Sequence, residues 1–137
     1  MATTKIAIRE LKPPKKAGEE KDIQWVVDSF VLSSKKDADC TAYKIFKAVV
    51  ESTLEDEPMT STQLSKLAGV TRGATLFHLQ KFSQSGLVRS EGRKYILRAP
   101  SLEETIDSMM QDMERMFSRM RKIASEIDKE LGYEGRW

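Results

Sequence analysis

The sequence predicts a mainly helical chain with a small β-wing and one long C-terminal helix. Residues 60–98 contain two short helical patterns, each with a capping signal, followed by two β-prone runs around a turn. Residues 101–131 contain neither proline nor glycine, and their apolar side chains recur every seven residues. Because the chain has 137 residues, 39% hydrophobic and 32% charged, we expect one domain with a core and a large exposed surface.

The two short helices are defined by their ends. Thr60 can cap the first helix, with Gln63 completing a capping box, and Gly69 supplies a left-handed stop. We expect three residues on its apolar face: Leu64, Leu67 and Ala68. Thr71 then caps the second helix, which ends at Gly86. Its buried side is expected to contain Thr75, Leu79 and Phe82, with Leu76 beside them.

A hairpin is expected from two β-prone runs, Leu87–Ser90 and Lys94–Arg98, on either side of the turn signal Glu91-Gly92. Helix, short turn, helix and a two-stranded wing make up the winged helix-turn-helix plan. Residues 60–98 carry seven basic side chains and one acid, a net charge of +6, whereas the whole chain has +2. This concentration of charge predicts a phosphate-binding surface.

Residues 70–79, VTRGATLFHL, and residues 85–88, SGLV, resemble the recognition helix and wing entry of ArsR-type winged-helix regulators. The resemblance is closest to small archaeal members that append a long C-terminal helix, and it covers the flanking helices only by position. It implies a DNA-binding regulator. Many ArsR members bind metal through clustered Cys, Asp and His, but here Cys40 and His78 are single and no Cys-x-Cys pair exists. We therefore expect no metal and no cofactor.

Residues 1–22 contain six basic side chains, four acids and a Pro13-Pro14 break. They favour a mobile tail, with a basic arm in a neighbouring minor groove as the alternative. A helix is expected within residues 23–32 from the stripe Ile23, Val26, Val27, Phe30 and Val31. Asp39 or Thr41 should cap the next helix, which residues 55–58 end. Its inward side chains are expected to be Ala42, Ile45, Phe46, Val49 and Leu54.

The long helix should start at a capping box formed by Ser101 and Glu104. At about 1.5 Å per residue it would be roughly 45 Å long, more than a small wing can bury. Its wide apolar stripe predicts a coiled-coil-like homodimer. The proposed dimerisation residues are Ile106, Met109, Met110, Met113, Met116, Phe117, Met120, Ile123, Ile127 and Leu131. The methionines favour adaptable packing over a Cu(I) site, while a pliable pocket for an apolar ligand stays open.

Catalysis finds no support, because His78 is the only histidine and lies within the recognition helix without nearby carboxylates. Arg72 is the best candidate base reader, with a phosphate contact as its alternative role. Phe77 could touch a thymine methyl or belong to the core; we favour DNA contact. Gln84 is a further possible polar contact. The expected DNA-binding residues are Thr71, Arg72, Gly73, Ala74, Phe77, Gln80, Lys81, Arg89, Arg93 and Lys94.

These observations favour an arm over residues 1–22, a winged helix-turn-helix domain with an extra N-terminal helix over 23–100, and a dimerisation helix and tail over 101–137. The predicted function is sequence-specific binding of double-stranded DNA as a homodimeric transcription regulator, with no effector identified. The alternatives are an abundant, weakly specific chromatin-type protein and a winged-helix protein-interaction module. No apolar run has membrane length and no signal core is present, so we expect a cytoplasmic, nucleoid-associated protein.

Overall fold

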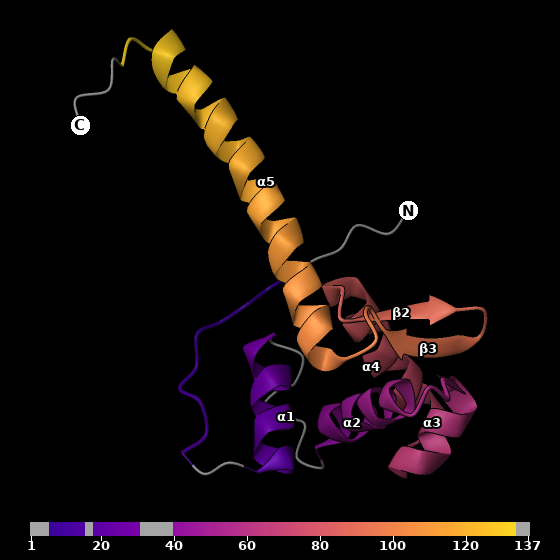
Figure 1. Ribbon diagram of the computed structural model, residues 1–137. Helices are drawn as coiled ribbons and strands as arrows, with labels where there is room; N and C mark the ends of the chain where they lie inside the picture. Colours follow the sequence, from indigo (N-terminus) through magenta and orange to yellow (C-terminus); the bar gives the residue numbers. More distant parts are fainter. Residues whose placement is uncertain (1–5, 16–17, 31–39, 134–137) are drawn as a thin grey trace.

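The computed structural model describes residues 6–15, 18–30 and 40–133. A group of four helices and a small sheet form the body, and a fifth helix projects from it (Figure 1). The elements in chain order are α1 (Glu19–Ser29), α2 (Thr41–Leu54), β1 (Met59–Thr60), α3 (Ser61–Ala68), α4 (Arg72–Ser85), β2 (Val88–Glu91), β3 (Lys94–Leu97) and α5 (Leu102–Glu130). This is the predicted winged helix-turn-helix fold with a long C-terminal helix.

The sheet has three strands in the order β1-β3-β2, so the prediction of a two-stranded wing was incomplete. Met59 pairs with Tyr95 and Thr60 with Lys94, both antiparallel. The hairpin loop also lies one residue later than predicted, because Glu91 pairs with Lys94 inside the ladder. Gly92, the first of the two loop residues, has a φ of +67° that favours glycine.

The core is built around α2, whose Ala42, Ile45, Phe46 and Val49 are buried as predicted. Leu54 was wrongly expected to point inward; it is 60% exposed. It is the last residue of α2, where the chain turns away from the core.

The start of α2 differs from the prediction. Thr41 is its first helical residue rather than its cap, and the cap position belongs to Cys40, which has a φ of +54°. Asp39, the other predicted cap, lies outside the described residues.

The first helix, α1, begins at Glu19, four residues before the apolar stripe that predicted it. Ile23 and Val27 are buried against the core, whereas Val26 and Phe30 are only partly buried. Val31 and the polar connector of residues 33–37 lie outside the described residues.

The N-terminal segment is attached to α1 rather than free over its described part. The backbone N–H of Arg9 donates to the Ser29 carbonyl oxygen at 2.9 Å, and its Nε donates to the Asp28 carbonyl oxygen at 2.8 Å. Trp25 Nε1 donates to the Leu11 carbonyl oxygen at 3.3 Å. This segment runs from beside α5 down to α1 (Figure 1). The mobility expected of residues 1–22 stays a prediction.

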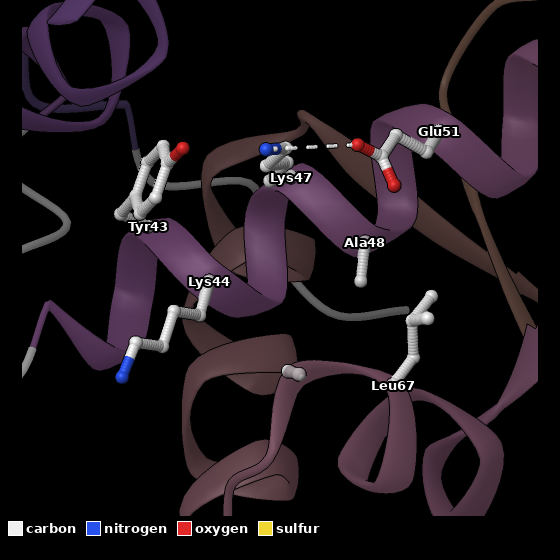
Figure 2. A pocket seen from close by; sticks show the side chains of 7 residues that line it. Tyr43, Lys44, Lys47, Ala48, Glu51 and Leu67 are labelled. Carbon is white, nitrogen blue, oxygen red and sulfur yellow. Dashed lines mark ion pairs between the residues drawn. The ribbon is translucent and has the colours of Figure 1, made fainter. Parts of the chain in front are cut away.

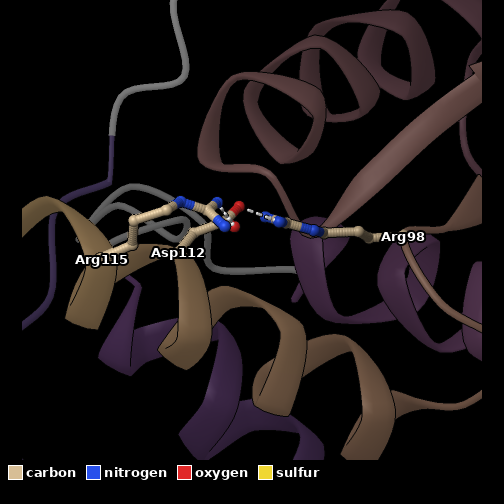
Figure 3. A network of polar contacts seen from close by, with 3 residues as sticks. All are labelled: Arg98, Asp112 and Arg115. Carbon is tan, nitrogen blue, oxygen red and sulfur yellow. Dashed lines mark hydrogen bonds and ion pairs between the residues drawn. The ribbon is translucent and has the colours of Figure 1, made fainter.

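The long helix α5 is most deeply covered by the body near its beginning, and further along Ile6 and Ala7 of the N-terminal segment line a hollow with Met113, Met116, Phe117 and Met120. Thr105 and Met109 are buried, and Thr105 Oγ1 accepts a hydrogen bond from the backbone N–H of Ala99 at 3.0 Å. One turn further on, Asp112 binds Arg98, the residue after β3, and Arg115 of its own helix (Figure 3). Hydrogen bonding from Arg98 holds the pKa of the Asp112 carboxyl below its ordinary value.

Candidate nucleic-acid interface

The helix-turn-helix pair is set by the predicted local signals. The Thr60 backbone N–H donates to Gln63 Oε1 at 2.9 Å, and the Gln63 backbone N–H donates to Thr60 Oγ1 at 3.3 Å, which completes the capping box of α3. Gly69 ends α3 with a φ of +69°. The Ala74 backbone N–H then donates to Thr71 Oγ1 at 3.2 Å, so Thr71 caps α4. These bonds fix where the exposed start of α4 lies.

Helix α4 presents one buried and one exposed face. The buried face contains Thr75, His78, Leu79, Phe82 and Ser85. The opposite stripe contains Arg72, Gly73, Leu76, Phe77, Gln80 and Gln84, all exposed. Leu76, expected beside the buried side, is 39% exposed. The DNA-contacting residues expected on α4 thus lie on the exposed surface, with two exceptions. Ala74 and Lys81 are half-buried.

The two buried hydroxyl groups of α4 have hydrogen-bond partners. Thr75 Oγ1 donates to the Thr71 carbonyl oxygen at 2.9 Å, and Ser85 Oγ donates to the Phe82 carbonyl oxygen at 2.7 Å. The ring centroid of His78 lies 5.3 Å from that of Phe77 and 6.3 Å from that of Phe82. His78 thus packs between two aromatic rings, in agreement with a structural histidine.

The basic side chains that follow α4 have two kinds of surroundings. On the wing, Arg89, Arg93 and Lys94 are exposed, although Arg89 lies 3.7 Å from Glu91. Arg98 is different, because its guanidinium binds Asp112 of α5 (Figure 3). Its charge is therefore neutralised locally, and it serves the attachment of α5 rather than the wing surface.

A hollow between α2 and α3 was not predicted. Its lining residues are Tyr43, Lys44, Lys47, Ala48, Glu51, Leu67 and Ala68. Figure 2 shows Leu67 reaching from α3 toward Ala48 of α2. Leu67 and Ala68, both expected on the apolar face of α3, line this hollow together, and Leu67 is 53% exposed. The charge of the nearby Glu19 carboxylate holds the pKa of the Lys47 ammonium above its ordinary value, and Tyr43 adds a smaller electrostatic effect in the same direction.

Comparison with known families gives one finding. A helix-turn-helix domain family matches residues 38–91. The match spans α2, β1, α3, α4 and β2, the elements that form and flank the exposed face of α4. No curated protein and no solved structure gives a significant match. The described part of residues 38–91 therefore has the helix-turn-helix fold, which is typical of DNA-binding domains.

Two further observations concern the described part of the chain alone. Within residues 6–15, 18–30 and 40–133, no helix combines the length and apolar character needed to cross a membrane. The same residues contain no group of three His, Cys, Asp or Glu side chains arranged to hold a metal ion.

Proposed function

We propose that this protein binds double-stranded DNA sequence-specifically, as a homodimeric transcription regulator. The observation that carries the proposal is the exposed face of α4, which begins at Arg72 and Gly73 within the helix-turn-helix match. A helix presented in this way fits the major groove of B-DNA, with its N-terminal residues at the base edges.

The DNA-contacting residues divide into two roles in this proposal. Arg72 and Gln80 on α4 read base edges, because arginine can bond guanine bidentately and glutamine can bond adenine. Thr71, Gly73 and Ala74 let the start of α4 approach the groove. On the wing, the exposed residues Arg89, Arg93 and Lys94 hold phosphates or the adjacent minor groove, which positions the domain without reading sequence.

Dimerisation through α5 is supported by the unusual exposure of its apolar side chains. Only Met109 of the expected dimerisation residues is fully covered, while Ile106 and Met113 are half-buried. The exposed members are Met110, Met116, Phe117, Met120, Ile123, Ile127 and Leu131. An apolar row along a projecting helix marks an interaction surface, and a second α5 presents a matching row.

The resemblance to small archaeal ArsR-type regulators favours the same arrangement and a location on the nucleoid. Two recognition helices would then enter successive major grooves, roughly 34 Å apart. A weakly specific chromatin-type protein would use the same surface, and the two functions differ in the ratio of specific to non-specific affinity.

Selection of bound fragments from genomic DNA at physiological salt tests the proposal. One enriched motif supports a regulator, whereas uniform coverage supports the chromatin-type function. Lack of DNA binding at moderate salt would contradict both. The Arg72→Ala variant should lose the motif, while Lys122→Ala, which removes an exposed positive charge from α5, should keep it.

A further inference from the structure

The exposed face of α4 contains two neighbouring apolar side chains. Phe77 is 54% exposed and Leu76 is 39% exposed, whereas the buried face of the same helix combines Leu79 and Phe82 with threonine, serine and histidine. Burial alone would favour polar side chains at the exposed positions 76 and 77. In the proposed function this face of α4 contacts DNA. The apolar patch on it should therefore pack against an apolar group of the DNA.

The Phe77 ring is held in place although it is exposed. The Lys81 ammonium lies over the ring, with Nζ 4.5 Å from its centroid, which is cation–π distance. The His78 ring meets it edge-on, at 5.3 Å between centroids and 77° between planes. Because His78 is itself buried against the body, it restricts the rotation of Phe77 from one side while Lys81 restricts it from another. An oriented ring loses little freedom when it makes a contact.

We propose that Phe77 reads the C5-methyl group of thymine in the major groove, with Leu76 widening the same apolar surface. The inference rests on the proposed function and names the base feature that the surface recognises. Thymine is the only DNA base that presents a methyl group in the major groove, and phenylalanine contacts it favourably. Gln80, one helical turn after Phe77 on the exposed stripe, offers an amide suited to adenine. The two side chains together fit A·T pairs.

The proposal can be tested by removing the methyl group from the DNA and the ring from the protein. Affinity is measured by fluorescence anisotropy for an alternating dA·dT duplex and for the same duplex with deoxyuridine in place of thymidine. A second pair compares dG·dC with dG·5-methyl-dC, which adds a methyl group at the same ring position. Full-length wild type should bind the methylated member of each pair more tightly, by about fourfold per contacted methyl group.

Three variants test whether the Phe77 ring is the cause of the preference for methylated duplexes. Phe77→Ala should bind all four duplexes but lose the methyl preference, and Phe77→Leu should retain part of it because an apolar side chain remains. Leu54→Ala, which truncates an exposed leucine on α2, should behave as wild type. Equal wild-type affinity for the members of each pair, or a full preference in Phe77→Ala, would overturn the inference while leaving DNA binding intact. Failure of wild type to bind any duplex would instead overturn the proposed function.

Discussion

Replacing Thr53 by valine should loosen the attachment of the wing to the core. The Thr53 hydroxyl donates to the Val49 carbonyl oxygen at 2.8 Å and accepts from the Leu97 backbone N–H at 3.1 Å. Leu97 lies in β3 and is fully buried. Its neighbour Arg98 uses its own N–H on the Leu87 carbonyl oxygen across the hairpin. Because successive strand residues point their N–H groups to opposite sides, the Leu97 N–H is directed at α2 and depends on Thr53.

Valine keeps the shape of threonine, so the main effect is the loss of this acceptor. An unpaired buried donor costs about 1–3 kcal/mol. At about 4 °C per kcal/mol for a domain of this size, Tm should fall by roughly 4–12 °C. Thermal unfolding followed by circular dichroism at neutral pH measures the change.

Ser52→Ala is the matched control for Thr53→Val. Ser52 is also buried, but its hydroxyl donates to the Val49 carbonyl oxygen at 3.1 Å and accepts no hydrogen bond from a backbone N–H of the described residues, so its removal leaves no donor unpaired. Its effect should be clearly smaller. A Thr53→Val variant as stable as wild type, or no more destabilised than Ser52→Ala, would refute the role assigned to the hydroxyl.

Three further predictions concern assembly, specificity and pH. The Met113→Glu/Met120→Glu variant should be monomeric in light scattering at micromolar concentration, where wild type should be dimeric, and should bind DNA more weakly. Arg72→Ala should cost on the order of 1–3 kcal/mol at a preferred site and less elsewhere, whereas Arg93→Ala should weaken binding to all sequences and reduce the salt slope by about one. Asp112→Asn should lower Tm at neutral pH, and the difference from wild type should narrow as pH falls below about 4.

The sign of the pH effect follows from the lowered pKa of Asp112. A carboxyl whose pKa is lower in the folded chain stabilises above its unfolded pKa and loses that contribution as acid protonates it. Asp107→Asn is the control, since Asp107 is exposed and accepts only from Gln111 within α5. A Tm difference for Asp112→Asn that stays constant into acid would contradict the ion-pair assignment. A monomeric wild type would likewise contradict the dimer, and an unchanged specificity ratio in Arg72→Ala would make Arg72 a phosphate contact.

Much of the fold could be predicted because its signals are local. Thr60, Thr71 and Ser101 act as caps through bonds to residues three positions away, and Gly69 and Gly86 end their helices by adopting positive φ. Such interactions are encoded within one turn of chain. The capping box predicted for Ser101 and Glu104 is formed in part. The Glu104 backbone N–H donates to Ser101 Oγ as expected, but the Glu104 carboxylate accepts from the Ser101 hydroxyl rather than from the Ser101 backbone N–H.

The features that were missed depend on residues far apart in the sequence. Strand β1 consists of Met59–Thr60 and exists because β3 offers an unpaired edge some distance along the chain. Leu54 and Leu67 fit the apolar periodicity of their helices but are exposed, because periodicity does not say how far the rest of the fold covers a helix face. Likewise, nothing local indicates that Arg98 binds Asp112 instead of joining the basic surface. The expected DNA contacts and the dimer remain predictions that binding and assembly measurements must test.

The polar contacts that join α5 to β3 and the segment after it lie at the base of the helix, in the Ala99–Thr105 hydrogen bond and the Arg98–Asp112 ion pair. From Asp112 to its end at Glu130, α5 extends about 27 Å at 1.5 Å per residue. A tilt of about 10° at the base would therefore displace the tip by about 5 Å, which exceeds the rise of one base pair in B-DNA. In the proposed dimer, a change confined to the Arg98–Asp112 ion pair would thus alter the distance between the two recognition helices, and with it the operator spacing that the protein accepts.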